Sequence, residues 1–213
     1  MHTIALSLSG AAVLMGFLVL ARAWKKKQWL QRAEALSDQA DYDLLALWEA
    51  RFVLARATGQ SITHVNARID NKTHRRLRVV IRPGTYFISS GAHQNMVTTT
   101  QHRFSIEPHK DATVRVQASC INAGRPVPGE TDRFQGVASV PASVMRFLET
   151  AVNEDPMVIQ AGVWALTDGY SGEDVENRLS ILAADGQKRQ AISAFQVAIA
   201  KRILDGLGLA NRL

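Results

Sequence analysis

Residues whose types and spacing could support chemistry are sparse in this chain of 213 residues, which has one cysteine and six histidines. No two histidines have the His-x-x-x-His spacing that places two metal ligands on one helix face, and a single cysteine cannot build a structural zinc site. The sequence also lacks a phosphate-binding glycine-rich loop and a nucleophile elbow. These features predict a protein without catalysis, metal or other cofactor. An enzyme with a site built from the loops at residues 122–136 or 91–95 stays an alternative.

Cys120 and Gln160 form the most specific pairing of reactive groups. Cys120 lies in an alternating, strand-like run that points its thiol into the core, where a thiol is inert. Gln160 begins the run Gln-Ala-Gly-Val-Trp, which ends at Trp164. This run resembles the Gln-x-x-apolar-Trp signature of thioester domains in Gram-positive surface proteins. The resemblance covers these three residues and implies an internal Cys120–Gln160 thioester that captures a nucleophile on a partner. The alternative is a small buried cysteine and an ordinary helical glutamine.

A second candidate surface is basic. Between residues 63 and 82, apolar side chains alternate with polar ones, which predicts strands with one buried and one exposed face. Several exposed positions are arginines, which suit an acidic partner surface. A solvated face that prevents edge-to-edge association of strands is the alternative. The candidate docking residues are Arg68, Arg76, Arg78 and Arg82.

The element expected to position the rest of the chain is the uncharged apolar run at residues 4–21. As a helix it would be about 27 Å long, enough to cross most of a bilayer core. The four cations at positions 22 and 25–27 follow it, and without them the formal net charge falls from +6 to +2. This predicts a membrane anchor whose charged flank is cytoplasmic, with a cleaved signal peptide as the alternative. The predicted anchor residues are Ile4, Leu8, Val13, Phe17 and Leu20, and the predicted lipid-headgroup contacts are Trp24, Lys25, Lys26 and Lys27.

The hydrophobic period divides the remaining chain into three parts and predicts an α+β fold. After the N-terminal transmembrane helix at 1–23 we expect an amphipathic helical stalk at 24–60. A small antiparallel immunoglobulin-like β-sandwich at 61–122 follows, with a hairpin turn at 71–73. A loop at 123–140 leads to a C-terminal helical subdomain at 141–213, where Asp155-Pro156 and Ser171 mark helix starts.

Together these features predict a non-catalytic, single-pass protein of the bacterial inner membrane, with its N-terminus outside and its domain in the cytoplasm. Such an accessory subunit would dock on and stabilise a larger energy-converting or transport complex. Its expected partners are other subunits and anionic lipid headgroups, because the positive charge is concentrated beside the anchor. That distribution does not favour nucleic acid. The single cysteine excludes an internal disulfide and fits a reducing compartment. The thioester alternative requires an exported domain.

Overall fold

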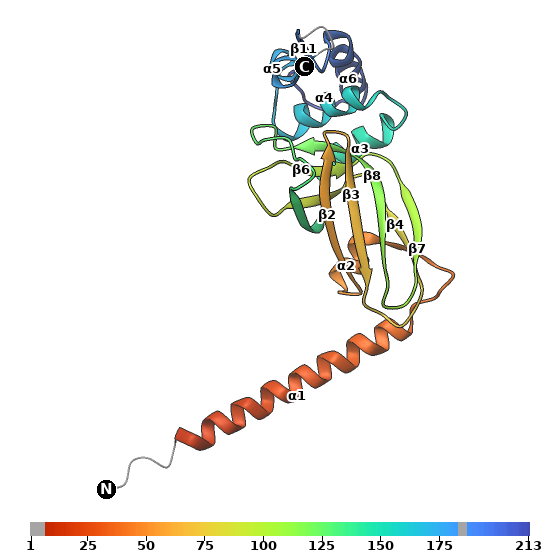
Figure 1. Ribbon diagram of the computed structural model, residues 1–213, viewed down its shortest axis with the longest axis vertical. Coiled ribbons are helices and arrows are strands. Elements are labelled where there is room, and N and C mark those ends of the chain that lie inside the picture. Colours follow the sequence, from red (N-terminus) through yellow and green to blue (C-terminus); the bar gives the residue numbers. More distant parts are fainter. Residues whose placement is uncertain (1–6, 183–186) are drawn as a thin grey trace.

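Helix α1 (Ser7–Glu34) leads away from the body of the protein, as Figure 1 shows. The computed structural model describes residues 7–182 and 187–213 of the chain. The side chains of α1 from Leu20 to Gln28 are exposed. The end of the helix contacts the body, because Ala33 is buried and the Trp29 ring lies 5.6 Å from the Phe52 ring, centre to centre.

The predicted membrane anchor is not supported. Among residues 7–182 and 187–213, no helix is both long and apolar enough to cross a membrane. The described part of α1 instead carries Arg22 and three consecutive lysines. The predicted transmembrane helix, the single-pass topology and the inner-membrane location are therefore wrong. Of the predicted anchor residues, Ile4 lies outside the described residues, Leu8, Val13 and Phe17 belong to α1, and Leu20 is 68% exposed.

A closed barrel of six antiparallel strands forms the centre of the molecule. Buried and more exposed residues alternate along β2 and the first part of β3, and small side chains such as Ala55, Ala57 and Ala67 are buried beside larger ones such as Phe134. The predicted immunoglobulin-like sandwich is wrong, because the first and last strands pair and close the sheet on itself. In spatial order the strands are β2 (Val53–Ser61), β3 (His64–Asn71), β8 (Asp111–Ile121), β6 (Asn95–Thr98), β5 (Thr85–Ser89) and β9 (Arg133–Ser139).

The segment predicted as one long stalk helix contains four elements. After α1 ends, β1 (Asp41–Asp43) leads into the short helix α2 (Leu44–Glu49), and β2 follows. Asp43 starts α2 because its carboxylate accepts hydrogen bonds from the amides of Leu45 and Ala46, at 2.9 and 3.4 Å. The helical period of this region therefore covers the end of α1 and the short helix α2, and the strand period begins at Val53.

A small second sheet lies beside the barrel. Strand β4 (Leu77–Ile81) pairs in parallel with β1 and antiparallel with β7 (His102–Ile106). The predicted hairpin between residues 63 and 82 does not form, because β3 pairs with β2 and β8. The connecting turn instead carries the chain from the barrel to the second sheet.

The C-terminal part is helical, with one small hairpin. The predicted start at Asp155-Pro156 is confirmed, because the Asp155 carboxylate accepts a 2.8 Å bond from the Met157 amide and Pro156 is the first helical residue. The predicted cap at Ser171 is confirmed as a capping box with Asp174. The elements are α3 (Ala142–Thr150), α4 (Pro156–Thr167), α5 (Gly172–Arg178), β10 (Ser180–Leu182), β11 (Lys188–Gln190) and α6 (Ala194–Gly206).

Candidate functional site

The structure brings Cys120 and Gln160 together where the barrel meets the C-terminal helices. Strand β3 pairs with β8 only as far as Gln117, and the last residues of β8 therefore lack a strand on that side. Gln160, on α4, takes the place of that strand. Its Oε1 accepts a 2.8 Å hydrogen bond from the Cys120 amide, and its Nε2 donates a 2.7 Å bond to the Cys120 carbonyl. This clamp satisfies two buried backbone groups and joins the barrel to α4.

The Cys120 thiol itself faces the barrel interior. Its Sγ lies 3.2 Å from Sδ of Met96 and 3.8 Å from the Ile62 carbonyl oxygen. Burial raises the pKa of this thiol to about 12, which keeps it protonated and unreactive at neutral pH. The hydrogen bonds between Cys120 and Gln160 thus use the main chain of Cys120 and the side chain of Gln160.

All four predicted docking arginines are paired within the chain, and three of them lie together at the second sheet. Arg76, Arg78 and Arg82 lie on or beside β4, and each is roughly half exposed. Their charges are partly neutralised by carboxylates from β1 and from the end of β7, which leaves less charge for a partner. The closest pairs are Arg76–Glu107 at 3.2 Å, Arg78–Asp41 at 2.9 Å and Arg82–Asp43 at 3.0 Å.

The fourth predicted arginine, Arg68, lies on a different surface, which we call the outer barrel face. It consists of eight outward side chains in two rows across β9, β2, β3 and β8, and seven of them line a groove of about 400 Å³. The pairing register of the strands determines these rows, because residues directly opposite one another on neighbouring strands point to the same face of the sheet. The first row is Gln135, Arg56, Arg68 and Thr113, and the second is Arg133, Thr58, Asn66 and Arg115.

Charge is unevenly distributed over the outer barrel face. Beside the first row, the Asp70 carboxylate forms an ion pair with Arg56 at 2.6 Å. Arg68 forms ion pairs with Asp70 at 3.5 Å and with Asp111 at 3.1 Å. In the part of the chain that the structure describes, the two arginines of the second row have no carboxylate within ion-pair distance. Arg133 on β9 and Arg115 on β8 lie at the two ends of the second row, three strand spacings or about 14 Å apart. The face therefore presents two unbalanced cations with Thr58 and Asn66 between them.

Two partly buried histidines border this face. Burial lowers the pKa of His64, and the nearby positive charge of Arg115 lowers it further. Burial also lowers the pKa of His102, with a smaller contribution from His64. His102 Nε2 accepts a hydrogen bond from the Gln117 amide at 3.3 Å, which requires an unprotonated nitrogen.

The sequence interpretation missed Arg56, Arg115 and Arg133. Arg56 lay in the predicted stalk and Arg133 in the predicted loop, and therefore neither was assigned to a strand. The two-residue period of a strand could have identified Arg56 as an outward residue, because it lies between Ala55 and Ala57, which are buried. The predicted headgroup residues are on α1, where Trp24 is 61% exposed and Lys25, Lys26 and Lys27 are exposed.

The two loops predicted as alternative sites pack against each other. His93 is buried, with Nδ1 3.4 Å from an Asp132 carboxylate oxygen and Nε2 3.1 Å from the Arg133 carbonyl oxygen. Gln94 donates a 2.8 Å hydrogen bond from its side chain to the Arg125 carbonyl. Both ring nitrogens of His93 are therefore occupied by neighbours from the other loop.

Across residues 7–182 and 187–213, no group of three or more His, Cys, Asp and Glu side chains is placed to hold a metal ion. Comparisons with protein-family models, with curated proteins and with solved structures find no match for the chain.

Proposed function

We propose that this chain is a non-catalytic docking module, an accessory subunit that binds an acidic surface of a partner protein through its outer barrel face. The observation that carries the proposal is the charge imbalance of that face. Arg115 and Arg133 stand at opposite ends of the second row without carboxylate partners among the described residues, while the acidic groups gather beside the first row.

The side chains of this face favour a protein partner. Guanidinium groups pair with carboxylates in two-bond geometry, and Thr58 and Asn66 between them can bond to a partner's backbone. A span of about 14 Å corresponds to roughly four residues of extended chain at about 3.3 Å each. The face therefore suits an extended segment with acidic residues about four positions apart.

Affinity purification from the native source tests the proposal. We expect a partner at defined stoichiometry with the unaltered chain, and its loss with the double variant Arg115→Ser/Arg133→Ser. Raising the salt concentration should release the partner, because exposed charges are screened. The matched control is Arg76→Ser/Arg103→Ser, which removes the same charge from exposed arginines that are already ion-paired. Isolation only as a free monomer, or equal behaviour of both double variants, would contradict the proposal.

A second candidate function is favoured by one observation, the contact between Cys120 and Gln160. We propose as this alternative that the pair forms an internal thioester for covalent capture of a partner. The Cys120 Sγ would turn from Met96 and attack Cδ of Gln160. A bond forms between Sγ and Cδ, the bond from Cδ to Nε2 breaks, and the nitrogen leaves as ammonia with the thiol hydrogen. A partner amine that attacked Cδ would then form an amide and free the thiol.

Intact mass of the natively produced chain separates the two candidates. Loss of ammonia lowers the mass by about 17 Da, and the Cys120→Ala variant cannot form the bond that requires it. Treatment with methylamine would then add one methylamine to the chain that carries the thioester. A mass equal to that of the plain sequence would remove the thioester and leave the docking proposal intact.

A further inference from the structure

Two exposed histidines meet where two turns of the chain lie side by side. His74 belongs to the turn that follows β3, and His109 belongs to the turn between β7 and β8. The Nδ1 atom of His74 lies 2.8 Å from Nε2 of His109. The two rings stand nearly perpendicular, at 82°, with their centres 4.4 Å apart. Two imidazole nitrogens thus face each other from turns that are far apart in the sequence.

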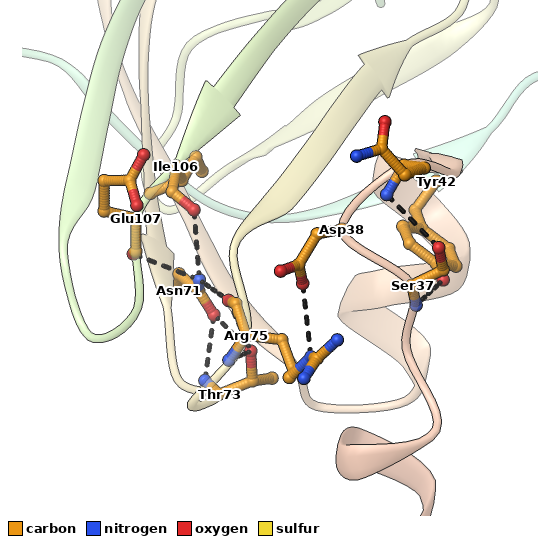
Figure 2. A network of polar contacts seen from close by, with 9 residues as sticks. Ser37, Asp38, Tyr42, Asn71, Thr73, Arg75, Ile106 and Glu107 are labelled. Carbon is orange, nitrogen blue, oxygen red and sulfur yellow. Dashed lines mark hydrogen bonds and ion pairs between the residues drawn. The ribbon is translucent and has the colours of Figure 1, made fainter.

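A buried asparagine holds these two turns together, as Figure 2 shows. Nδ2 of Asn71 donates to the carbonyl oxygens of Arg75 at 2.8 Å, Ile106 at 3.3 Å and Glu107 at 3.1 Å. Its Oδ1 accepts 2.8 Å bonds from both the amide and the hydroxyl of Thr73. One amide side chain therefore fixes the backbone next to both histidines.

The backbone of His109 shows that its position is specified. Its φ angle is 56°, in the left-handed region that residues other than glycine seldom adopt. Its amide bonds to the Thr73 carbonyl at 3.3 Å, which ties His109 to the residue just before His74. This bond holds the two histidine-bearing turns side by side.

We propose that His74 and His109 bind one divalent transition-metal ion, with Cu²⁺ preferred, through these facing nitrogens. Two nitrogens about 2.0 Å from one metal and about 90° apart lie roughly 2.8 Å from each other, which matches the observed separation. Imidazole suits Cu²⁺, Ni²⁺ and Zn²⁺, and of these Cu²⁺ binds most tightly and favours square geometry. The remaining coordination positions are open to water.

Binding changes the position of one hydrogen atom. In the metal-free pair, one facing nitrogen carries a hydrogen that points at the other nitrogen. Coordination needs a lone pair on both nitrogens, and the hydrogen must therefore move to the far nitrogen of its ring or leave as a proton. No electron transfer is involved, and the metal keeps its charge.

The test is a titration of the untagged full chain with CuCl₂, followed by calorimetry and electron paramagnetic resonance. All samples carry His2→Asn, because a histidine next to a terminal amine can itself bind Cu²⁺. We expect one equivalent of Cu²⁺ with at least two nitrogen ligands. His74→Asn and His109→Asn should each weaken binding at least tenfold, and asparagine tolerates the left-handed backbone at position 109. His102→Asn is the matched control and should leave the affinity unchanged.

Circular dichroism confirms that each variant is folded before its affinity is compared. Equal Cu²⁺ affinity in the His2→Asn reference chain and in both site variants would overturn the proposal. A spectrum with a single nitrogen ligand would also overturn it, as would an equal loss of affinity in the His102→Asn control. A second readout is thermal unfolding, because an ion that binds only the folded chain raises the unfolding midpoint. That rise should be absent in both site variants.

Discussion

Replacing Gln160 by methionine tests the clamp between the barrel and α4. Methionine keeps the unbranched shape of glutamine but cannot bond to the Cys120 amide and carbonyl, which Gln160 contacts at 2.8 and 2.7 Å. Both residues are fully buried, and water cannot replace the lost partner without opening the core.

The magnitude follows from the two backbone groups left unpaired. Each buried unsatisfied group costs about 1–3 kcal/mol, which together gives about 2–6 kcal/mol. Burial of the apolar methionine side chain offsets part of this loss, because it removes a polar amide from the core. We therefore expect Gln160→Met to lower the free energy of unfolding by about 3 kcal/mol. For a chain of this size, that corresponds to a fall in the unfolding midpoint of roughly 6–12 °C.

Urea unfolding followed by circular dichroism measures this change. The control is Cys120→Ala, which leaves the clamped backbone in place and removes only the sulfur atom beside Met96. That deletion should cost about 1 kcal/mol, as expected for a small cavity. If Gln160→Met costs no more than Cys120→Ala, the two hydrogen bonds do not stabilise the fold as argued.

Three further predictions concern other parts of the fold. Burial lowers the pKa values of His64 and His102 in the folded chain. As the pH falls through about 6.5, these histidines therefore bind protons in the unfolded chain before they do so in the folded chain. The free energy of unfolding should consequently fall from pH 7.5 to pH 5.5. Urea midpoints at the two pH values measure the fall, and His102→Gln should reduce it, whereas a flat or opposite dependence would contradict the sign. Gly162→Ala places a Cβ 2.0 Å from the buried Phe147 ring. By the same assay it should lower the free energy of unfolding by about 1–3 kcal/mol, although alanine favours helices. A stabilised variant would show that Gly162 and Phe147 are not in this close contact. Asn71→Ala removes three donated and two accepted bonds, and a loss below about 2 kcal/mol in thermal unfolding would show that this network contributes little.

Local signals in the sequence predicted several elements correctly. The start of α4 could be predicted because Asp155 and Pro156 act on the first turn that they themselves begin. The same holds for Ser171, whose partner lies three residues away. The alternation before Cys120 likewise predicted most of β8. Each of these signals depends on neighbours in the sequence.

Barrel closure depends on partners that lie far apart in the sequence. Strands β2 and β9 pair through residues such as Ala57 and Phe134, and no short-range pattern specifies that contact. Strand β9 also lies in a region rich in glycine and proline, which favoured a loop. The apolar residues Phe134 and Val137, which the structure buries, gave only a weak strand signal, because they are three positions apart and do not alternate.

For the candidate sites too, the sequence pattern predicted local features but not the contacts between distant residues. The residue pattern singled out Cys120 and Gln160 as a pair, and the structure brings them into contact. The manner of contact could not be predicted, because it depends on where β3 stops pairing with β8. The alternating arginines predicted an exposed basic face, but Asp41 and Asp43 reach them only through the parallel pairing of β1 with β4.

Helix α1 makes the molecule much longer than its body. Its 28 residues span about 42 Å at 1.5 Å per residue, and Figure 1 shows it directed away from the barrel. Such a shape increases hydrodynamic drag, and the chain should sediment more slowly than a sphere of equal mass. Among the described side chains of α1, from Leu20 to Glu34, the part that packs against the body lies near Trp29 and Ala33, and helices without packing are marginal in water. Amide hydrogens should therefore exchange progressively faster from the packed end of α1 toward Leu20.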